Sequence, residues 1–150
     1  MPEPGGPTMS VLWPPAGGDK STNNDSVVLR IQYGERTILL TGDIEEEAER
    51  ALLASQQAMH ADVIKVAHHG SKTSSTEGFV VATKPQFAII SVGRNSRFGH
   101  PHKEVVERWQ SNGATVLTTG NNGTITITTD GHDLNLQTFV QPQKGTKGRK

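Results

Sequence analysis

The sequence contains no cysteine, which excludes disulfide bonds and thiolate metal ligands. Any bound metal ion would therefore rely on imidazole, carboxylate or water ligands. Long apolar runs are absent too: no stretch approaches the roughly 20 consecutive apolar residues that a membrane-spanning helix needs. The Pro- and Gly-rich first residues contain none of the apolar core that marks a signal peptide. The lack of cysteine assigns no compartment, because such a chain suits both sides of a membrane.

Net charge is also lacking, since 15 Lys and Arg residues balance 15 Asp and Glu residues. No global charge therefore indicates a nucleic-acid or membrane partner. The 150 residues fit one domain, and a hydrophobic share of 33% is sufficient for a thin α/β core. We expect residues 1–9 to be a leader or linker, residues 10–140 to fold as one domain, and residues 141–150 to be a disordered basic tail.

The order of the apolar segments predicts the fold class. β-Branched segments at 26–33 and 37–40, separated by a turn at Gly34–Glu35, predict a hairpin. Segments with helix and strand periodicity then alternate, with helices expected at 44–55, 74–84 and 101–112, and strands at 61–67, 87–92, 114–118, 123–129 and 134–140. We therefore predict an α/β fold, in which a mixed sheet carries about three helices on one face and a C-terminal β-meander follows.

Three of the expected strands end in side chains that carry chemistry. Asp43 follows the first, His68 and His69 follow the second, and His100 follows the third. Successive groups are roughly 30 residues apart, which is the length of one strand–helix unit. Because the carboxyl ends of parallel strands share one edge of a sheet, we expect these side chains to converge there. An Asp and several His residues without Cys suit zinc or manganese.

Each of these residues also has a purely structural interpretation. Asp43 with Glu46 three residues later fits a helix-capping box, and it also suits a carboxylate that bridges two metal ions. Adjacent side chains on an extended segment point in opposite directions, so only one of His68 and His69 is expected to be a direct ligand. We favour His69 as the ligand, with His68 facing either the substrate or the residues that support the metal ligands.

The loops around these positions supply further candidates. Pro101 is expected to start a helix and thereby to direct His100 and His102 apart, which leaves His100 as the candidate for a role in the site. Ser71 and Lys72 precede an expected helix start, where free N–H groups bind phosphate; a Ser-rich cap is the alternative. Arg94 and Arg97 also suit a phosphate, although exposed arginine is common. Two histidines are interpreted as ordinary surface residues, His60 and His132.

Several segments together resemble a known family. They read LLTGDIEEEAE, ADVIKVAHHGSKTSS, AIISVGRNSRFGHPHKEVVERW and NNGTITITTDG, and VLWPP and NNDSVVLRI precede them. In this order, from Ser10 to Gly131, they are similar to the C-terminal metallo-β-lactamase-like domain of ComEC-type competence proteins. The resemblance implies half of a four-layer αββα sandwich. It also implies two divalent metal ions, zinc or manganese, held between the two halves of the complete domain.

The resemblance assigns roles to individual residues. Asp43 would bridge both metal ions, and His69 would ligate one of them. His68 and His100 would be catalytic residues that assist the substrate or the leaving group. By composition Asn24 is an ordinary loop residue, but it lies in one of the similar segments. The candidate substrate-binding residues are Ser71, Lys72 and Asn24.

One departure from the family limits these expectations. Family members carry H-x-H-x-D-H in their first half, and that motif supplies most of the metal ligands; this sequence does not contain it. Asp43 and His69 are only two ligands, whereas a catalytic zinc site uses three and a water molecule. We therefore expect the chain alone to bind no metal ion tightly and to be inactive or barely active.

For a longer parent protein, the resemblance implies a metal-dependent nuclease that hydrolyses phosphodiesters during DNA uptake. Its partners would be single-stranded DNA, the rest of the lactamase-like domain and a membrane channel. Its location would be extracytoplasmic, and the chain itself is expected to be soluble. One alternative is a non-catalytic module that binds nucleic acid or a partner through basic residues of the tail, Lys144, Lys147, Arg149 and Lys150. Another is a homodimer that covers the apolar face left by a missing sandwich half.

Overall fold

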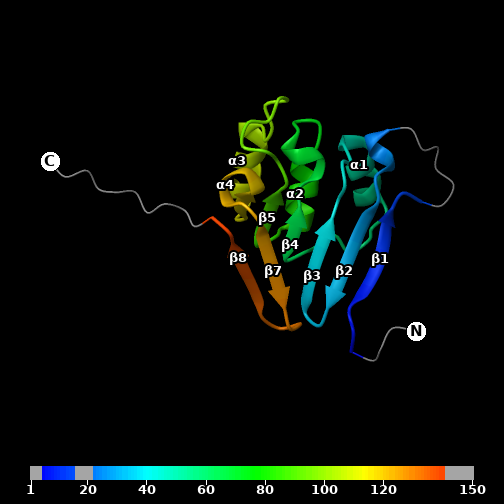
Figure 1. Ribbon diagram of the computed structural model, residues 1–150. Helices are drawn as coiled ribbons and strands as arrows, with labels where there is room; N and C mark the ends of the chain where they lie inside the picture. The colour runs from blue at the N-terminus through cyan, green and yellow to red at the C-terminus, as the bar shows by residue number, and fades with distance from the viewer. Residues whose placement is uncertain (1–4, 16–21, 141–150) are drawn as a thin grey trace.

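The computed structural model describes residues 5–15 and 22–140 (Figure 1). Its strands are β1 (Thr8–Trp13), β2 (Val28–Tyr33), β3 (Arg36–Leu40), β4 (Val63–Lys65), β5 (Phe87–Ile90), β6 (Thr115–Thr118), β7 (Ile125–Thr129) and β8 (Leu134–Thr138). Its helices are α1 (Glu46–Ala54), α2 (Glu77–Thr83), α3 (Lys103–Ser111) and the short α4 (Thr119–Asn122), with 3₁₀ turns η1 (Asn23–Asp25) and η2 (Ala67–Gly70). Strand β1 begins inside the range expected to be a leader or linker, and the tail expected at 141–150 lies outside the described residues.

The main sheet is mixed and has six strands in the order β1-β2-β3-β4-β5-β6. The first three strands are antiparallel neighbours, and β3 to β6 are parallel. The connections between successive parallel neighbours contain α1, α2 and α3, which lie on one face of the sheet (Figure 1). The predicted α/β class, with a mixed sheet and about three helices on one face, is therefore confirmed. The three strands expected to form one C-terminal meander belong to two sheets. Strand β6 joins the main sheet beside β5, and β7 and β8 form a separate antiparallel hairpin.

The hydrophobic core lies between the sheet and these helices. Alternate strand residues point toward the helices and include Leu39, Ile64 and Ile90, all fully buried. The helices bury large side chains against them, among them Ile44 before α1 and Trp109 of α3. This packing fixes the strands and thus the positions of the loops at their carboxyl ends.

The helices begin later than the sequence predicted. Asp43 does not cap α1, which starts at Glu46; instead the side-chain oxygen of Asn24 accepts hydrogen bonds from the backbone N–H groups of Glu45 (2.8 Å) and Ala48 (3.4 Å). The expected capping box is therefore wrong, because a residue from a distant loop occupies the helix start. The Asp43 carboxylate is consequently not engaged as a helix cap.

The expected starts of the next two helices are wrong for similar reasons. Ser74 does not open α2, since its hydroxyl donates to the carbonyl of Ile44 at 2.7 Å and the helix starts at Glu77. Pro101 does not open α3 either: that helix starts at Lys103, with His102 in the N-cap position. Tertiary contacts decide both boundaries.

A buried carboxylate from α1 holds the loop before α2. Glu49 is fully buried, and its two carboxylate oxygens accept hydrogen bonds from the backbone N–H groups of Ser75 (2.6 Å) and Thr76 (2.7 Å). Burial raises the pKa of the Glu49 carboxyl, while the hydrogen bonds from Thr76 and Ser75 and the charge of Arg108 oppose that rise. Arg108 also donates to the carbonyl of Ser75, and the Trp109 indole donates to its hydroxyl at 3.2 Å. The start of α2 is thus fixed to the core.

The face of the sheet away from the helices is also apolar. Paired positions across the strands form two rows, Met9–Ile31–Ile38–Val63–Phe87 and Val11–Leu29–Leu40–Lys65–Ile89. The β7–β8 hairpin lies on this side, where its turn accepts a hydrogen bond at Gly131 from the N–H of Glu35 (2.7 Å). At the β1 edge the rows remain open, with Met9 69% and Val11 63% exposed. No helix within the described ranges is long and apolar enough to cross a membrane.

Candidate metal-ligand site

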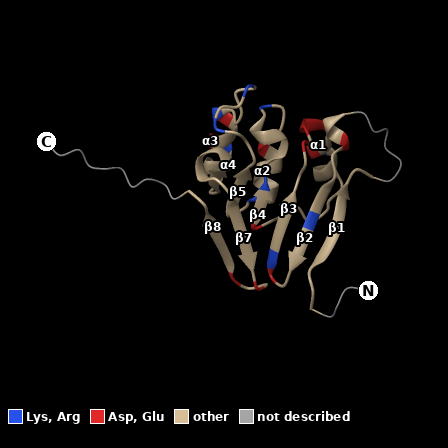
Figure 2. Ribbon diagram, viewed as in Figure 1, with Lys and Arg blue, Asp and Glu red and all other residues tan. Residues whose placement is uncertain are grey.

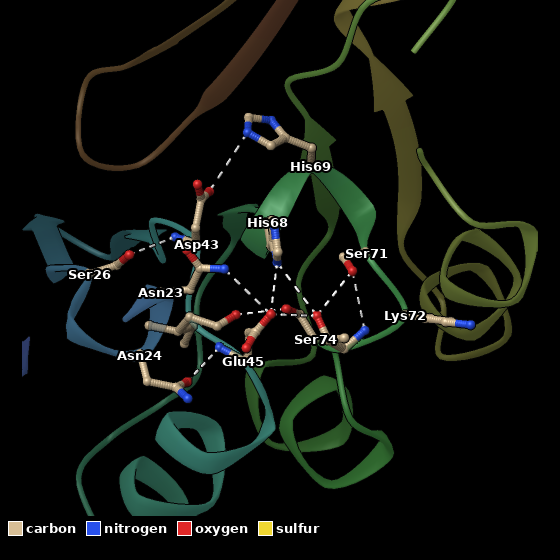
Figure 3. A network of polar contacts seen from close by, with 12 residues as sticks. Asn23, Asn24, Ser26, Asp43, Glu45, His68, His69, Ser71, Lys72 and Ser74 are labelled. Carbon is tan, nitrogen blue, oxygen red and sulfur yellow. Dashed lines mark hydrogen bonds and ion pairs between the residues drawn. The ribbon is translucent and has the colours of Figure 1, made fainter. Parts of the chain in front are cut away.

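The residues that follow β3, β4 and β5 meet at one edge of the sheet. Asp43 lies just after β3, His68 and His69 lie in the η2 turn after β4, and His100 lies in the loop between β5 and α3. Figure 3 shows Asp43, His68 and His69 on neighbouring segments at this edge. The convergence expected from the strand order is thus present, because β3, β4 and β5 are parallel neighbours.

Asp43 and His69 face each other. The carboxylate oxygen Oδ1 of Asp43 lies 3.9 Å from Nε2 of His69. Nδ1 of His69 is 2.6 Å from the carbonyl oxygen of Ser91, and since a carbonyl only accepts, Nδ1 carries the proton. In the neutral ring Nε2 therefore has a lone pair, and it is the ring nitrogen nearer to Asp43. A hydrogen bond from the second ring nitrogen to a carbonyl is the usual support of a metal-binding histidine.

One contact of its backbone and one of its carboxylate position Asp43. Its N–H donates to the hydroxyl of Ser26 at 3.1 Å. The ammonium group of Lys65 lies 4.0 Å from its carboxylate and donates to the carbonyl of Gly42 at 3.2 Å. Burial lowers the pKa of Lys65, and the charge of Asp43 opposes that change. The carboxylate is thus held beside one partly buried cation.

The tandem histidines do not lie on an extended segment, so that premise was wrong. His68 (φ 47°) and His69 (φ 54°) are both left-handed, a conformation that non-glycine residues seldom adopt. Gly70 follows with φ +80°, and a Cβ atom there would lie 2.7 Å from Cβ of Pro101. The turn is therefore packed tightly against the segment that carries His100. The two imidazoles still diverge, with His69 directed to Asp43 and His68 to Glu45 (Figure 3).

Glu45, which sequence reasoning missed, holds His68. Its Oε1 lies 3.2 Å from Nδ1 of His68 and accepts a hydrogen bond of 2.8 Å from the hydroxyl of Thr73. Nδ1 of His68 also lies 3.5 Å from the hydroxyl oxygen of Thr73, whose own proton goes to Glu45, so Nδ1 is the donor in that contact and Nε2 is unprotonated in the neutral ring. Glu45 is the first of three consecutive glutamates, which we interpreted as charges that favour a helix start, and no pattern around it indicates that it faces the histidine.

The histidines form a continuous cluster of rings. The ring of His100 lies 5.7 Å from that of His68 and 5.0 Å from that of His102. His102 is therefore not directed away from His100 as expected, and its Nδ1 accepts a hydrogen bond from the N–H of Lys72 at 3.2 Å. Burial lowers the pKa of His100, and the neighbouring His102, His68 and His69 lower it further. His100 is thus a neutral ring near pH 7.

The candidate substrate-binding residues occupy different environments. Ser71 is buried and its hydroxyl lies 3.0 Å from that of Thr73, while Asn24 caps α1. Lys72 is exposed and points away from the other labelled residues in Figure 3. The helix start expected beside them is wrong, because α2 begins at Glu77. Their substrate-binding role stays a prediction.

As a metal site, this arrangement is incomplete. Two donors of a tetrahedral zinc ion lie about 3.4 Å apart when each is roughly 2.1 Å from the metal, so the Asp43–His69 separation of 3.9 Å suits two ligands of one ion. Across residues 5–15 and 22–140, however, no three His, Asp or Glu side chains are grouped so that they could hold a metal ion. The pair fits as part of a ligand set that needs further donors.

No family model matches the chain. The chain is 44% identical over 115 residues to ComE operon protein 3 of Bacillus subtilis. The aligned segment covers 77% of the chain and 15% of that protein. It is 34% identical to Recombination protein 2 of Haemophilus influenzae (72% of the chain, 14% of the relative) and 33% identical to Competence protein ComA of Neisseria gonorrhoeae (69% and 15%). The chain thus spans about one seventh of the length of these relatives.

Proposed function

We propose that this relative of competence proteins is the C-terminal part of a metallo-β-lactamase-like domain that hydrolyses phosphodiesters of single-stranded DNA during DNA uptake. Asp43 and His69 serve as ligands of its dinuclear metal centre, with zinc or manganese. The observation that carries this proposal is their separation of 3.9 Å at the carboxyl edge of the sheet, with the second nitrogen of His69 bonded to the Ser91 carbonyl. Similarity to segments of proteins named for competence supports the biological setting.

The missing ligands are assigned to a part of the longer protein outside this chain. The H-x-H-x-D-H motif of the resembled family would supply them. The open apolar rows around Met9 and Val11 support this assignment, since such a face is stabilised when another layer packs on it. In this proposal the second half of the sandwich covers that face, and the domain lies outside the cytoplasm beside the membrane channel that moves the DNA.

The residues of this chain would perform distinct tasks at the centre. When bound, a pair of divalent ions lowers the pKa of a coordinated water and neutralises charge on the phosphate. Glu45 keeps the proton of His68 on Nδ1, so Nε2 accepts a proton or a hydrogen bond on the side away from Glu45. His100, neutral because burial and its histidine neighbours lower its pKa, offers an uncharged donor or acceptor for the substrate or leaving group.

A second candidate is a module that binds nucleic acid or a partner without catalysis. It is favoured by the absence of a third metal-binding side chain from the group around Asp43 and His69 in the described ranges. A homodimer through the open apolar face is the form in which such a module would cover Met9 and Val11. Under this alternative, Asp43 and His69 would have no effect on any chemical step.

The test uses the longer protein that contains this segment. Asp43→Ala and His69→Ala should each reduce manganese- or zinc-dependent cleavage of single-stranded DNA by about a hundredfold or more, because a lost ligand weakens metal binding and activity. His60→Ala is the matched control, since His60 is exposed and precedes β4, whereas His68 and His69 follow the opposite end of that strand. Undiminished cleavage in both site variants would overturn the proposal. DNA binding with a steep salt dependence and no cleavage in the unmodified protein would favour the module.

A further inference from the structure

A cavity of about 560 Å³ opens beside His69. Its floor is formed by Ser91 to Gly93 after β5, and a second wall is formed by Thr119 and Gly120 at the start of α4. The loop from Ser96 to His100 completes it. Because His69 belongs both to this cavity and to the pair with Asp43, a ligand in the cavity would extend directly from the candidate metal site.

An exposed aromatic ring stands at the rim of this cavity. Phe98 is 80% exposed although it is the most apolar side chain of its loop. Its ring lies 6.0 Å from the ring of His100 with an angle of 34° between the planes. Leaving a phenylalanine in water forgoes the stabilisation that burial would give. A flat ligand stacked on the ring would recover that stabilisation.

The charge around Phe98 favours an anionic ligand. Arg97 lines the cavity and brings a positive charge, and none of the described residues that line the cavity carries a carboxylate. Arg94, beside the cavity, donates to the carbonyl of Gly120 at 3.0 Å and is held in place. Figure 2 shows basic residues on the loops at this edge, and acidic residues at α1 and on the helices α2 and α3. The ligand thus combines negative charge with a flat apolar surface.

We propose that this cavity is a subsite for an unpaired nucleobase of single-stranded nucleic acid. The base stacks on Phe98, and the phosphate next to it pairs with Arg97, which leads the strand toward Asp43 and His69. Single strands are favoured because the bases of a duplex are stacked on each other and offer no free face to Phe98. Every base has such a face, so the subsite tolerates any sequence. That the bound strand is then cleaved rests on the proposed function. Binding of a base and its phosphate at this subsite does not depend on it.

The experiment measures binding of the full chain without divalent metal, by fluorescence anisotropy of a labelled oligothymidylate. Phe98→Ala should weaken binding by about five- to a hundredfold, as expected for one lost base–aromatic stack. Phe98→Trp should retain the affinity and Phe98→Leu should not, because stacking needs a ring. Phe139→Ala is the matched control: Phe139 is 84% exposed, does not line the cavity, and should leave the affinity unchanged.

Two further probes identify the groups of the strand that bind. On an oligonucleotide of the same length with abasic sites, the chain and Phe98→Ala should bind equally. Arg97→Gln should weaken binding to both strands and lower the slope of log affinity against log salt by about 0.7, the value for one phosphate contact on a single strand. Equal weakening of the abasic and the normal strand by Phe98→Ala would indicate a role unrelated to bases and would overturn the proposal.

The remaining outcomes separate this inference from the proposed function. No saturable binding of the oligothymidylate, full affinity in Phe98→Ala, or full affinity in Phe98→Leu would each overturn the subsite, whatever the longer protein cleaves. A different combination would separate the two proposals: binding to the chain depends on Phe98, but cleavage by the longer protein is unchanged in Asp43→Ala and His69→Ala. This result would support the subsite and reject the hydrolase. Since Phe98 and Arg97 are both exposed, their variants should fold normally.

Discussion

Replacement of the buried carboxylate of Glu49 should destabilise the whole chain. In Glu49→Gln the amide offers one acceptor where the carboxylate offers two, so either Ser75 N–H or Thr76 N–H meets an NH₂ group. An unsatisfied buried donor costs about 1–3 kcal/mol, and the surviving bond loses its charge assistance. We expect a loss of about 2–4 kcal/mol in the free energy of unfolding. Glu49→Ala leaves both donors without a partner and should cost about 2–6 kcal/mol.

Urea unfolding of the purified chain measures this difference. Native domains are stable by about 5–15 kcal/mol, so the shift in the midpoint would be large. Glu47→Gln is the control, because Glu47 is exposed on the same helix and its substitution should change stability by about 0.5 kcal/mol or less. A loss below about 0.5 kcal/mol in Glu49→Gln would refute the assignment of Glu49 as the acceptor for both N–H groups.

Three other predictions follow from the contacts around the site. Asn24→Ala should lower the free energy of unfolding by about 1 kcal/mol, the value of a helix cap, whereas Asn24→Asp should not lower it. Thermal unfolding measures both variants. Equal melting temperatures for the wild type and Asn24→Ala would contradict the capping role of Asn24. Glu45→Ala should let the proton of neutral His68 distribute over both ring nitrogens, which long-range ¹H–¹⁵N NMR spectra report; an unchanged Nδ1–H tautomer would show that Glu45 does not position the ring. Calorimetric titration of the chain with Zn²⁺ or Mn²⁺ should show no tight stoichiometric binding, because Asp43 and His69 provide only two ligands; tight binding that disappears in Asp43→Ala would reject this expectation.

The fold could be predicted because its signals are local. Alternating apolar segments of strand and helix period gave the mixed sheet with helices on one face, and Gly34–Glu35 marked the hairpin correctly. The helix starts could not be predicted in the same way. Asn24 caps a helix about 20 residues away, and Glu49 binds the loop before α2 from another helix. Such contacts depend on the tertiary structure, which no window of sequence contains.

The site was predicted in outline and missed in detail. Parallel strand order brings Asp43 and His69 to one edge, and that order follows from the alternation of strands and helices. The partner of His68 was missed because Glu45 is one of three consecutive glutamates whose side chains differ only in direction. Phe98 was missed because a phenylalanine in a loop is ordinarily expected to be buried, and only the structure shows its exposure.

The left-handed backbone conformation of His68 and His69 lowers the stability of the fold, although both imidazoles are needed for the proposed site. Each such backbone conformation in a non-glycine residue costs on the order of 1–3 kcal/mol, a cost that glycine avoids and asparagine bears more easily. A laboratory selection for heat resistance alone would therefore tend to place glycine or asparagine in this turn and eliminate both imidazoles. Variants recovered from such a selection should be sturdier scaffolds that have lost the groups facing Asp43 and Glu45.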